Sequence, residues 1–202
     1  MRRWIASLLV LLALCAGCGG STPKLAKLGA SDVVVAFGDS LTYGTGAKEQ
    51  ESYPAVLAQL IGRTVVRAGV PGEQTAGGLQ RLPAVLDEHQ PRLVIVCLGG
   101  NHMLRKGSHQ VIEGNLREIL KTIKARGMDA VLVGVPAPGL ITSAPDFYDK
   151  LAGEFGIPYE GKMVTSVLYK PELKSDPIHP NADGYRRIAE AIAKLLRDAG
   201  AV

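Results

Sequence analysis

Short apolar runs rich in β-branched residues alternate along the chain with longer segments of helical periodicity. The runs fall at 33–37, 64–66, 93–98 and 130–135, with a shorter candidate at 157–159. Apolar residues recur every three or four positions in the segments between them, at 52–61, 76–89, 109–126, 145–155 and 181–198. Because the runs are continuously apolar, we expect strands that are buried on both faces. The pattern predicts a doubly wound α/β domain, with a parallel sheet of about five strands between two helical layers.

The residues with the most chemical interest follow these predicted strands. Ser40 comes after the first run, Gly72 after the second and Asn101 after the third, while Asp176 and His179 lie just before the last helical segment. The carboxyl ends of parallel strands meet at one edge of a sheet, and ligands bind there. We therefore expect all five residues to reach the same edge.

The N-terminus has a separate pattern. Two arginines follow Met1, and the apolar stretch 4–16 is about 13 residues long, short of the roughly 18 needed to cross a bilayer. We expect a signal peptide over 1–17. Small residues precede Cys18, as in the lipobox of bacterial lipoproteins, which predicts a lipid on Cys18; the alternative is an ordinary cleaved signal with incidental cysteines. We expect residues 18–30 to form a flexible tether without core residues, and residues 31–202 to form the folded domain.

Composition narrows the choice of function without deciding it. The 202 residues suffice for one well-buried domain, and 47% hydrophobic with 21% charged residues is ordinary for a globular protein. The net charge is +4 without a dense basic stripe, so no nucleic-acid partner is expected. Three cysteines do not make a disulfide framework. Cys97 lies in an apolar run, where we expect a buried and unreactive thiol.

The glycines near Ser40 match no nucleotide-binding motif. Neither the phosphate-binding P-loop nor a dinucleotide fingerprint follows the first strand. The nucleophile elbow Gly-x-Ser-x-Gly is also absent, because Thr42 occupies its second glycine position. We expect Asp39 to accept backbone N–H groups in the turn around Ser40.

A carboxylate precedes one histidine at a spacing that suits catalysis. Asp176 lies three residues before His179, so it can bind one imidazole nitrogen and leave the other free to take a serine proton. The N–H groups of Ser40 and Gly72 and the side-chain amide of Asn101 could stabilise an oxyanion. No acid has this spacing to His102, which we expect to support the Asn101 loop instead.

Taken together and in order, these blocks resemble the SGNH (GDSL) hydrolase family. They are Gly38-Asp39-Ser40-Leu41, Gly72, Gly99-Gly100-Asn101 and Asp176-x-x-His179-Pro180. The likeness covers about residues 31–199 and is greatest to the branch of thioesterase I, lysophospholipase L1 and arylesterases. It implies a flavodoxin-like α/β/α sandwich, with Ser40 as nucleophile, His179 as base, Asp176 as its orienting acid, and an oxyanion hole of Ser40, Gly72 and Asn101. His102 replaces the acid usual in this branch, and Gln74 replaces a threonine.

The resemblance implies a serine esterase, and the N-terminal pattern predicts that it is exported and lipid-anchored in the cell envelope. Its substrates would be short-to-medium acyl or aryl esters, with thioesters and lysophospholipids as further candidates, and no metal or organic cofactor is implied. Large apolar residues on the expected rim could line the substrate pocket: Met103, Leu104, Leu140, Ile141, Phe147 and Ile178. The alternatives are a carbohydrate O-deacetylase of the same fold and a non-catalytic envelope lipoprotein that binds ligands.

Overall fold

Five parallel strands form the centre of the protein. The computed structural model describes residues 22–137 and 143–202, and the sheet order is β2-β1-β3-β4-β5. The strands are β1 (Val33–Gly38), β2 (Thr64–Gly69), β3 (Leu93–Cys97), β4 (Asp129–Val133) and β5 (Tyr159–Glu160). Residues 34–37 and 94–96 have no exposed surface, because helices cover both faces of the sheet. The predicted α/β fold is confirmed.

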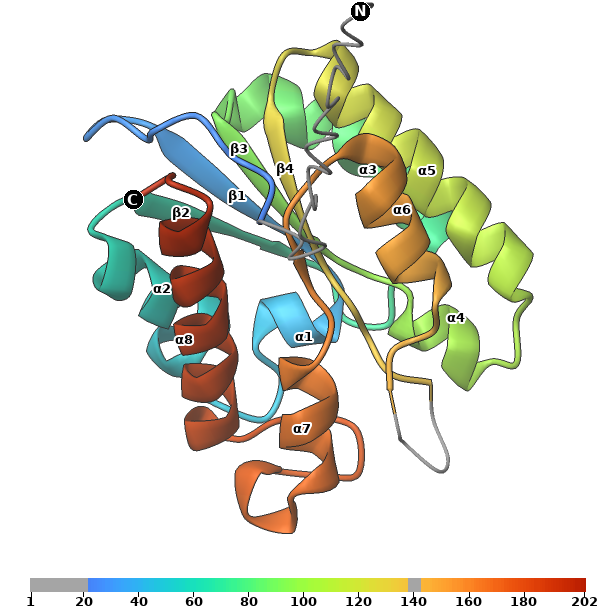
Figure 1. Ribbon diagram of the computed structural model, residues 1–202. Helices are drawn as coiled ribbons and strands as arrows, with labels where there is room; N and C mark the ends of the chain where they lie inside the picture. The colour runs from blue at the N-terminus through green and yellow to red at the C-terminus, as the bar shows by residue number, and fades with distance from the viewer. Residues whose placement is uncertain (1–21, 138–142) are drawn as a thin grey trace, which may run out of the picture.

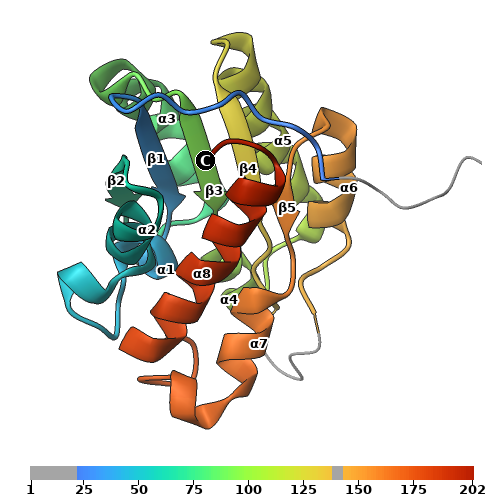
Figure 2. The same cartoon turned by 60° about the vertical axis from the view of Figure 1, so that its left-hand side comes forward.

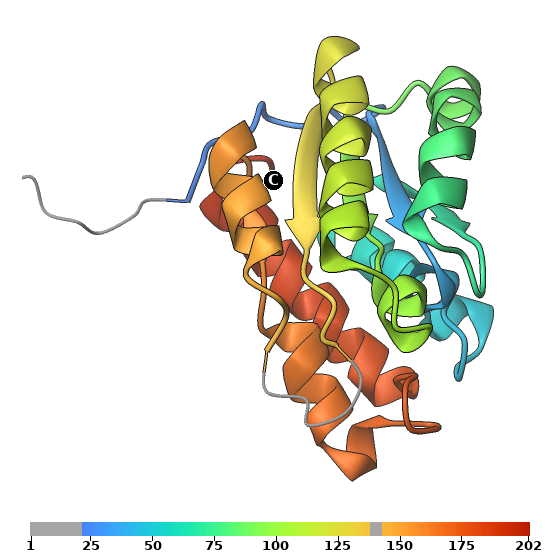
Figure 3. The ribbon, with the colours of Figure 1, turned by 90° about the vertical axis from the view of Figure 1, so that its right-hand side faces the viewer.

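The long helices form two layers. One face of the sheet carries α2 (Tyr53–Ile61) and α8 (Ala182–Asp198), and the other carries α3 (Thr75–His89), α5 (His109–Ala125) and α6 (Phe147–Phe155). Figures 1 and 3 show the sheet between these layers, with α5 and α8 on opposite sides. All five helices coincide with predicted segments to within two residues.

The strand order reverses between β1 and β3, which are neighbours although β2 lies between them in the chain. Open α/β sheets bind ligands at such a switch point, beyond the carboxyl ends of the strands. Three short helices gather at this edge (Figure 1): α1 (Ser40–Tyr43), α4 (Gly100–Leu104) and α7 (Met163–Tyr169). Two 3₁₀ turns, Glu49–Glu51 and Pro171–Leu173, accompany them. The sequence pattern missed these elements, because none is long enough to display a clear helical period.

The strand ends differ from the prediction in two informative places. The second strand was expected over 64–66 but continues to Gly69, which pairs with Gly38 at the end of β1. The fourth strand was expected over 130–135 but ends at Val133. Val135 is apolar because it lines the cavity described below, not because it belongs to the sheet.

Residues 22–30 contact the domain more closely than a flexible tether would. The backbone N–H groups of Leu25 and Leu28 donate to the carbonyls of Ala199 and Ala201, at 3.0 and 2.8 Å. Leu28 is only 2% exposed and joins the core, so the expectation of no core residue in this segment is wrong. Figure 2 shows the segment beside the C-terminus, along the edge where the strands begin. The expected signal peptide and Cys18 lie outside the described residues, and no helix in 22–137 or 143–202 is long and apolar enough to cross a membrane.

Candidate active site

Ser40 stands at the sharp turn between β1 and α1. Asp39 caps the helix, and Ser40 is its first residue, so the serine is held directly beyond the strand end. A Cβ atom at position 38 would lie only 2.1 Å from the carbonyl oxygen of Cys97. Glycine is therefore required before Asp39 for β1 and β3 to approach closely enough to form this edge.

A continuous chain of hydrogen bonds connects Ser40 to Asp176. The Oγ atom of Ser40 lies 3.0 Å from Nε2 of His179, and Nδ1 of His179 lies 2.7 Å from Oδ2 of Asp176. A carboxylate on Nδ1 holds the proton there and leaves the lone pair of Nε2 facing the serine hydroxyl. The structure therefore brings Ser40, His179 and Asp176 together at the edge of the sheet, as the sequence predicts.

The turn 174–180 fixes Asp176 against His179. The other oxygen of Asp176, Oδ1, accepts the backbone N–H groups of Ile178 and His179 at 2.9 Å each. The backbone N–H of Ser175 donates to the carbonyl of His179 at 3.0 Å, which closes the turn. Burial raises the pKa of Asp176, but the hydrogen bonds from His179 and Ile178 outweigh it and leave the pKa below its ordinary value. Asp176 is therefore a carboxylate at neutral pH.

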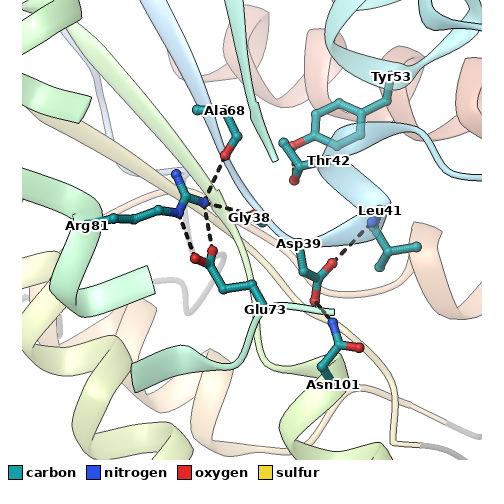
Figure 4. A network of polar contacts seen from close by, with 9 residues as sticks. All are labelled: Gly38, Asp39, Leu41, Thr42, Tyr53, Ala68, Glu73, Arg81 and Asn101. Atoms are coloured by element: carbon teal, nitrogen blue, oxygen red, sulfur yellow. Dashed lines mark hydrogen bonds and ion pairs between the residues drawn. The ribbon is translucent and has the colours of Figure 1, made fainter. Parts of the chain in front are cut away.

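Asp39 is the second carboxylate of the site, and it is almost completely buried. It is 1% exposed; Oδ1 accepts the N–H of Leu41 and Oδ2 accepts Nδ2 of Asn101, both at 3.1 Å (Figure 4). The predicted acceptance of a backbone N–H by Asp39 is confirmed. Burial raises the pKa of Asp39 from 3.8 to about 6, although both hydrogen bonds act against it. The contact also orients Asn101, because only the nitrogen of its amide can donate to a carboxylate.

A small cavity of about 50 Å³ opens beside Ser40, Asn101 and His179. Asp39 and Gly100 also line it, and the rest of its wall is apolar and comes from the strand ends and from α1, α4, α7 and the histidine turn: Leu41, Leu104, Val135, Pro136, Ala137, Leu168, Pro177 and Ile178. Such a wall suits an apolar group attached to a polar reacting centre.

The rim residues expected from the sequence divide into three groups. Leu104 and Ile178 line the cavity. Met103 and Phe147 are 5% and 6% exposed and belong to the core, where Phe147 packs on Tyr148. Leu140 and Ile141 lie outside the described residues. Val135, Ala137 and Leu168 also line the cavity, and they could not be predicted because nothing in an apolar sequence run distinguishes a cavity wall from the core.

Gly72 and His102 lie beside this site without lining the cavity. Gly72 occupies the exposed turn after β2 with φ +79°, a conformation that favours glycine. The Nδ1 atom of His102 lies 3.3 Å from Oγ1 of Thr75, which also accepts Nδ2 of Asn115 at 2.9 Å. His102 therefore links α4 to the start of α3, while His179 is the histidine that contacts Ser40.

The site offers side chains for acid–base chemistry. Across 22–137 and 143–202, no group of three or more His, Cys, Asp or Glu residues is placed to hold a metal ion. Cys97 is a free thiol that is 1% exposed, and burial raises its pKa well above the usual value. The expectation of a buried thiol is confirmed, and the raised pKa disfavours the reactive thiolate.

Known proteins share both the sequence and the fold. The model of the GDSL-like lipase/acylhydrolase family matches residues 36–187. Thioesterase 1/protease 1/lysophospholipase L1 of Escherichia coli K12 is 36% identical over 179 residues, which are 85% of this chain and 86% of that protein. Arylesterase of Vibrio mimicus is 33% identical and covers 83% of this chain and 89% of its own.

A solved structure agrees with these sequence relatives. AlinE4, described as an SGNH-hydrolase family esterase, superposes with a TM-score of 0.65 at 35% identity, covering 86% of this chain and 98% of its own. The family match spans most of the described domain and contains the turn of Ser40, the Asn101 helix and the histidine turn. The chain therefore belongs to the GDSL-like lipase/acylhydrolase family and is a carboxylic ester hydrolase of the SGNH type.

Proposed function

We propose that this hydrolase acts through an acyl-serine intermediate, with Ser40 as nucleophile, His179 as general base and Asp176 as the acid that orients it. The observation that carries the proposal is the uninterrupted contact of Asp176 with Nδ1 and of Ser40 with Nε2, at 2.7 and 3.0 Å. The 3.0 Å contact is within the distance at which a proton moves from a nucleophile to its base, and the 2.7 Å contact holds the imidazole in the orientation that this transfer needs.

The reaction proceeds in two halves. Nε2 of His179 takes the hydroxyl proton as Oγ of Ser40 bonds to the carbonyl carbon, and the carbonyl electron pair moves onto oxygen. When this intermediate collapses, the bond to the leaving oxygen or sulfur breaks, and His179 gives that atom its proton. Water then gives a proton to His179 and attacks the acyl carbon, and Oγ departs with the proton, which releases the acid.

Three N–H donors are proposed for the oxyanion: the backbone groups of Ser40 and Gly72 and Nδ2 of Asn101. Gly72 is included because of its place in the family motif, and two observations support the other two donors. Ser40 and Asn101 share one cavity, and Asp39 binds one N–H of the Asn101 amide, which fixes the direction of the other. Removing one such donor costs about 10²- to 10³-fold in kcat in enzymes of this kind.

The proposed substrates are short-to-medium acyl or aryl esters. The cavity is small and its wall is mainly apolar, which favours a compact apolar group over an acetylated sugar. Arylesterase and thioesterase activities in the names of two relatives agree with this choice. We expect a higher kcat/KM for p-nitrophenyl butyrate to octanoate than for acetylated xylan. The opposite order would favour the O-deacetylase.

The proposed location is the cell envelope, with a lipid on Cys18. Leu25, which makes the first backbone bond to the domain, is only seven residues beyond Cys18, so the link spans at most about 25 Å. This segment runs along the edge where the strands begin, whereas Ser40 lies where β1 ends. The proposed anchor would therefore attach at the end of the sheet opposite the cavity, which is compatible with esters dissolved in water.

The decisive experiment replaces Ser40 or His179 with alanine and measures kcat on p-nitrophenyl butyrate. Each variant should lose about 10³-fold or more, and the double variant should lose little more, since the two residues act as a unit. Mass spectrometry of rapidly quenched wild-type enzyme should show the butyryl group on the peptide that contains Ser40. Turnover near the wild-type rate in the Ser40→Ala variant would refute the mechanism and favour another nucleophile.

A further inference from the structure

A partly buried ion pair lies behind the catalytic edge, between α3 and the ends of two strands (Figure 4). Nε of Arg81 donates to Oε1 of Glu73, and Nη2 donates to Oε2, both at 2.7 Å. Nη2 also donates to the carbonyl oxygens of Gly38 and Ala68, each at 3.0 Å. One guanidinium therefore binds the end of β1, the end of β2 and the turn that follows β2.

The pair is poorly explained by stability alone. The side chains of Glu73 and Arg81 are 8% and 23% exposed, and the guanidinium carbon lies 4.1 Å from the ring centroid of Phe37. Desolvating two charges offsets most of their mutual attraction, so apolar residues of similar size often stabilise a fold at least as well. What the charged pair adds is direction, because a planar guanidinium fixes a carboxylate at two points.

The segments that Arg81 joins carry two of the proposed oxyanion donors. Gly38 precedes Ser40 by two residues, and Glu73 directly follows Gly72. The turn 70–73 is tight, because the N–H of Glu73 donates to the Val70 carbonyl at 3.1 Å. It is also tied to the end of β1, because the N–H of Val70 donates to the Gly38 carbonyl at 3.0 Å. The relative position of the Ser40 and Gly72 N–H groups therefore depends on this junction.

The turn itself has little packing that could hold it. Pro71 and Gly72 are exposed, and a Cβ atom added to Gly72 would meet nothing within 4 Å. The side chain of Glu73 is the part of the turn that reaches the interior, and Arg81 is its partner there. Without this contact the Gly72 N–H would sample several orientations, and a misplaced donor stabilises an oxyanion poorly.

We propose that Arg81 is a positioning residue for ester hydrolysis, which acts through Glu73 to fix the Gly72 N–H relative to the Ser40 N–H. This inference rests on the proposed function, because it presumes that the two N–H groups bind the oxyanion. Arg81 acts on the transition state through this geometry, and it does not itself touch the substrate.

The test compares Arg81→Met, Arg81→Lys and Glu73→Gln with a matched control, Arg117→Met. Arg117 forms a similar ion pair between α5 and α6, with Glu154 at 3.0 Å and Glu113 at 2.7 Å, and it does not line the cavity. Its side chain is 29% exposed, close to the 23% of Arg81. Thermal melting and titration with a p-nitrophenyl phosphonate give the folded, active fraction of each variant before kcat is calculated.

We expect kcat on p-nitrophenyl butyrate to fall about 10- to 100-fold in Arg81→Met, less than the loss of a whole donor, with KM changed less than about threefold. Arg81→Lys should recover only part of this loss, because an ammonium cannot donate along two fixed directions. The kcat of Glu73→Gln should lie between those of Arg81→Met and Arg81→Lys. Arg117→Met should keep kcat within about twofold of the wild type, even if its melting temperature falls as far as that of Arg81→Met.

A second measurement separates positioning from general loosening of the fold. Butylboronic acid forms a tetrahedral adduct on the serine, so its inhibition constant should rise in proportion to the loss of kcat/KM across the Arg81 and Glu73 variants. Unchanged kcat and boronate affinity in folded Arg81→Met, or an equal loss in Arg117→Met, would overturn the proposal. Activity that survives Ser40→Ala would instead refute the proposed function, so the two failures are distinct.

Discussion

Replacing Asp39 with asparagine should stabilise the protein and impair catalysis at the same time. The substitution removes the charge of a residue that is only 1% exposed, but it keeps the shape of the side chain. The side-chain oxygen of the new amide could still accept the N–H of Leu41, which Asp39 accepts at 3.1 Å. The amide nitrogen would then face Nδ2 of Asn101, and two donors cannot bond, so the amide of Asn101 must turn over.

The pKa of Asp39 gives the size of the stability effect. Burial, opposed by hydrogen bonds, raises this pKa from 3.8 to about 6, a difference of about two units, and each unit is worth about 1.4 kcal/mol. Between these pH values the folded protein keeps a proton that the unfolded chain has lost. The unfolding free energy of the wild type therefore falls by about 3 kcal/mol as the pH rises through this window, and the variant lacks this fall.

Urea unfolding of both proteins at pH 4, 5, 6 and 7 measures the effect directly. The unfolding free energy of Asp39→Asn minus that of the wild type should rise by about 2 kcal/mol from pH 4 to pH 7, because part of the full effect already falls below pH 4 and other titrating groups are common to both. At pH 8, kcat should fall about 10²- to 10³-fold, because the Asn101 donor is turned away. A difference that stays constant with pH would refute the buried charge, and an unchanged kcat would refute the role of Asp39 in orienting Asn101.

Three further predictions concern other residues. His102→Ala should lower kcat about 10-fold by loosening the contact with Thr75, and His102→Asp should retain most activity; a folded His102→Ala as inactive as His179→Ala would refute this supporting role. Asp176→Asn should lower kcat at least about 10²-fold, since an amide no longer holds the proton on Nδ1, and rates within about fivefold of the wild type would contradict this role. Mass spectrometry of the mature protein should find lipid on an N-terminal Cys18, whereas an unmodified N-terminus beyond Cys18 would exclude the anchor.

Much of the fold and the centre of the site follow from local sequence patterns. A buried parallel strand needs apolar residues on both faces, so a continuous apolar run such as 93–98 can be predicted as a strand from the sequence. The pairing of Asp176 with His179 is also local, because three residues of a tight turn bring the two side chains together. The edge on which Ser40 and Asn101 meet follows from parallel topology alone.

Features that depend on tertiary partners could not be predicted in this way. A polar residue such as Glu73 belongs to a solvated surface unless a partner from another element covers it, and Arg81 is eight residues away in the middle of a helix. Leu28 lies in a short segment of lysines, small residues and one other leucine that has no strand or helix pattern, and it is buried because the chain after α8 returns beside it. Val135 and Leu168 differ from core residues only by the cavity that they enclose.

Two buried carboxylates at one edge are held in different ways, and the difference has a chemical consequence. Glu73 is neutralised by Arg81, whereas Asp39 has only hydrogen-bond donors as partners among the described side chains. Asp39 therefore lies near His179 as a carboxylate whose pKa is raised by burial, and the attraction of His179 opposes that rise only slightly. The same charge favours the imidazolium that forms when His179 takes the proton of Ser40, yet it opposes the oxyanion. A cation on Asp39 would cancel both effects and remove the acceptor that orients Asn101, so catalysis is better served by a carboxylate that is costly to bury.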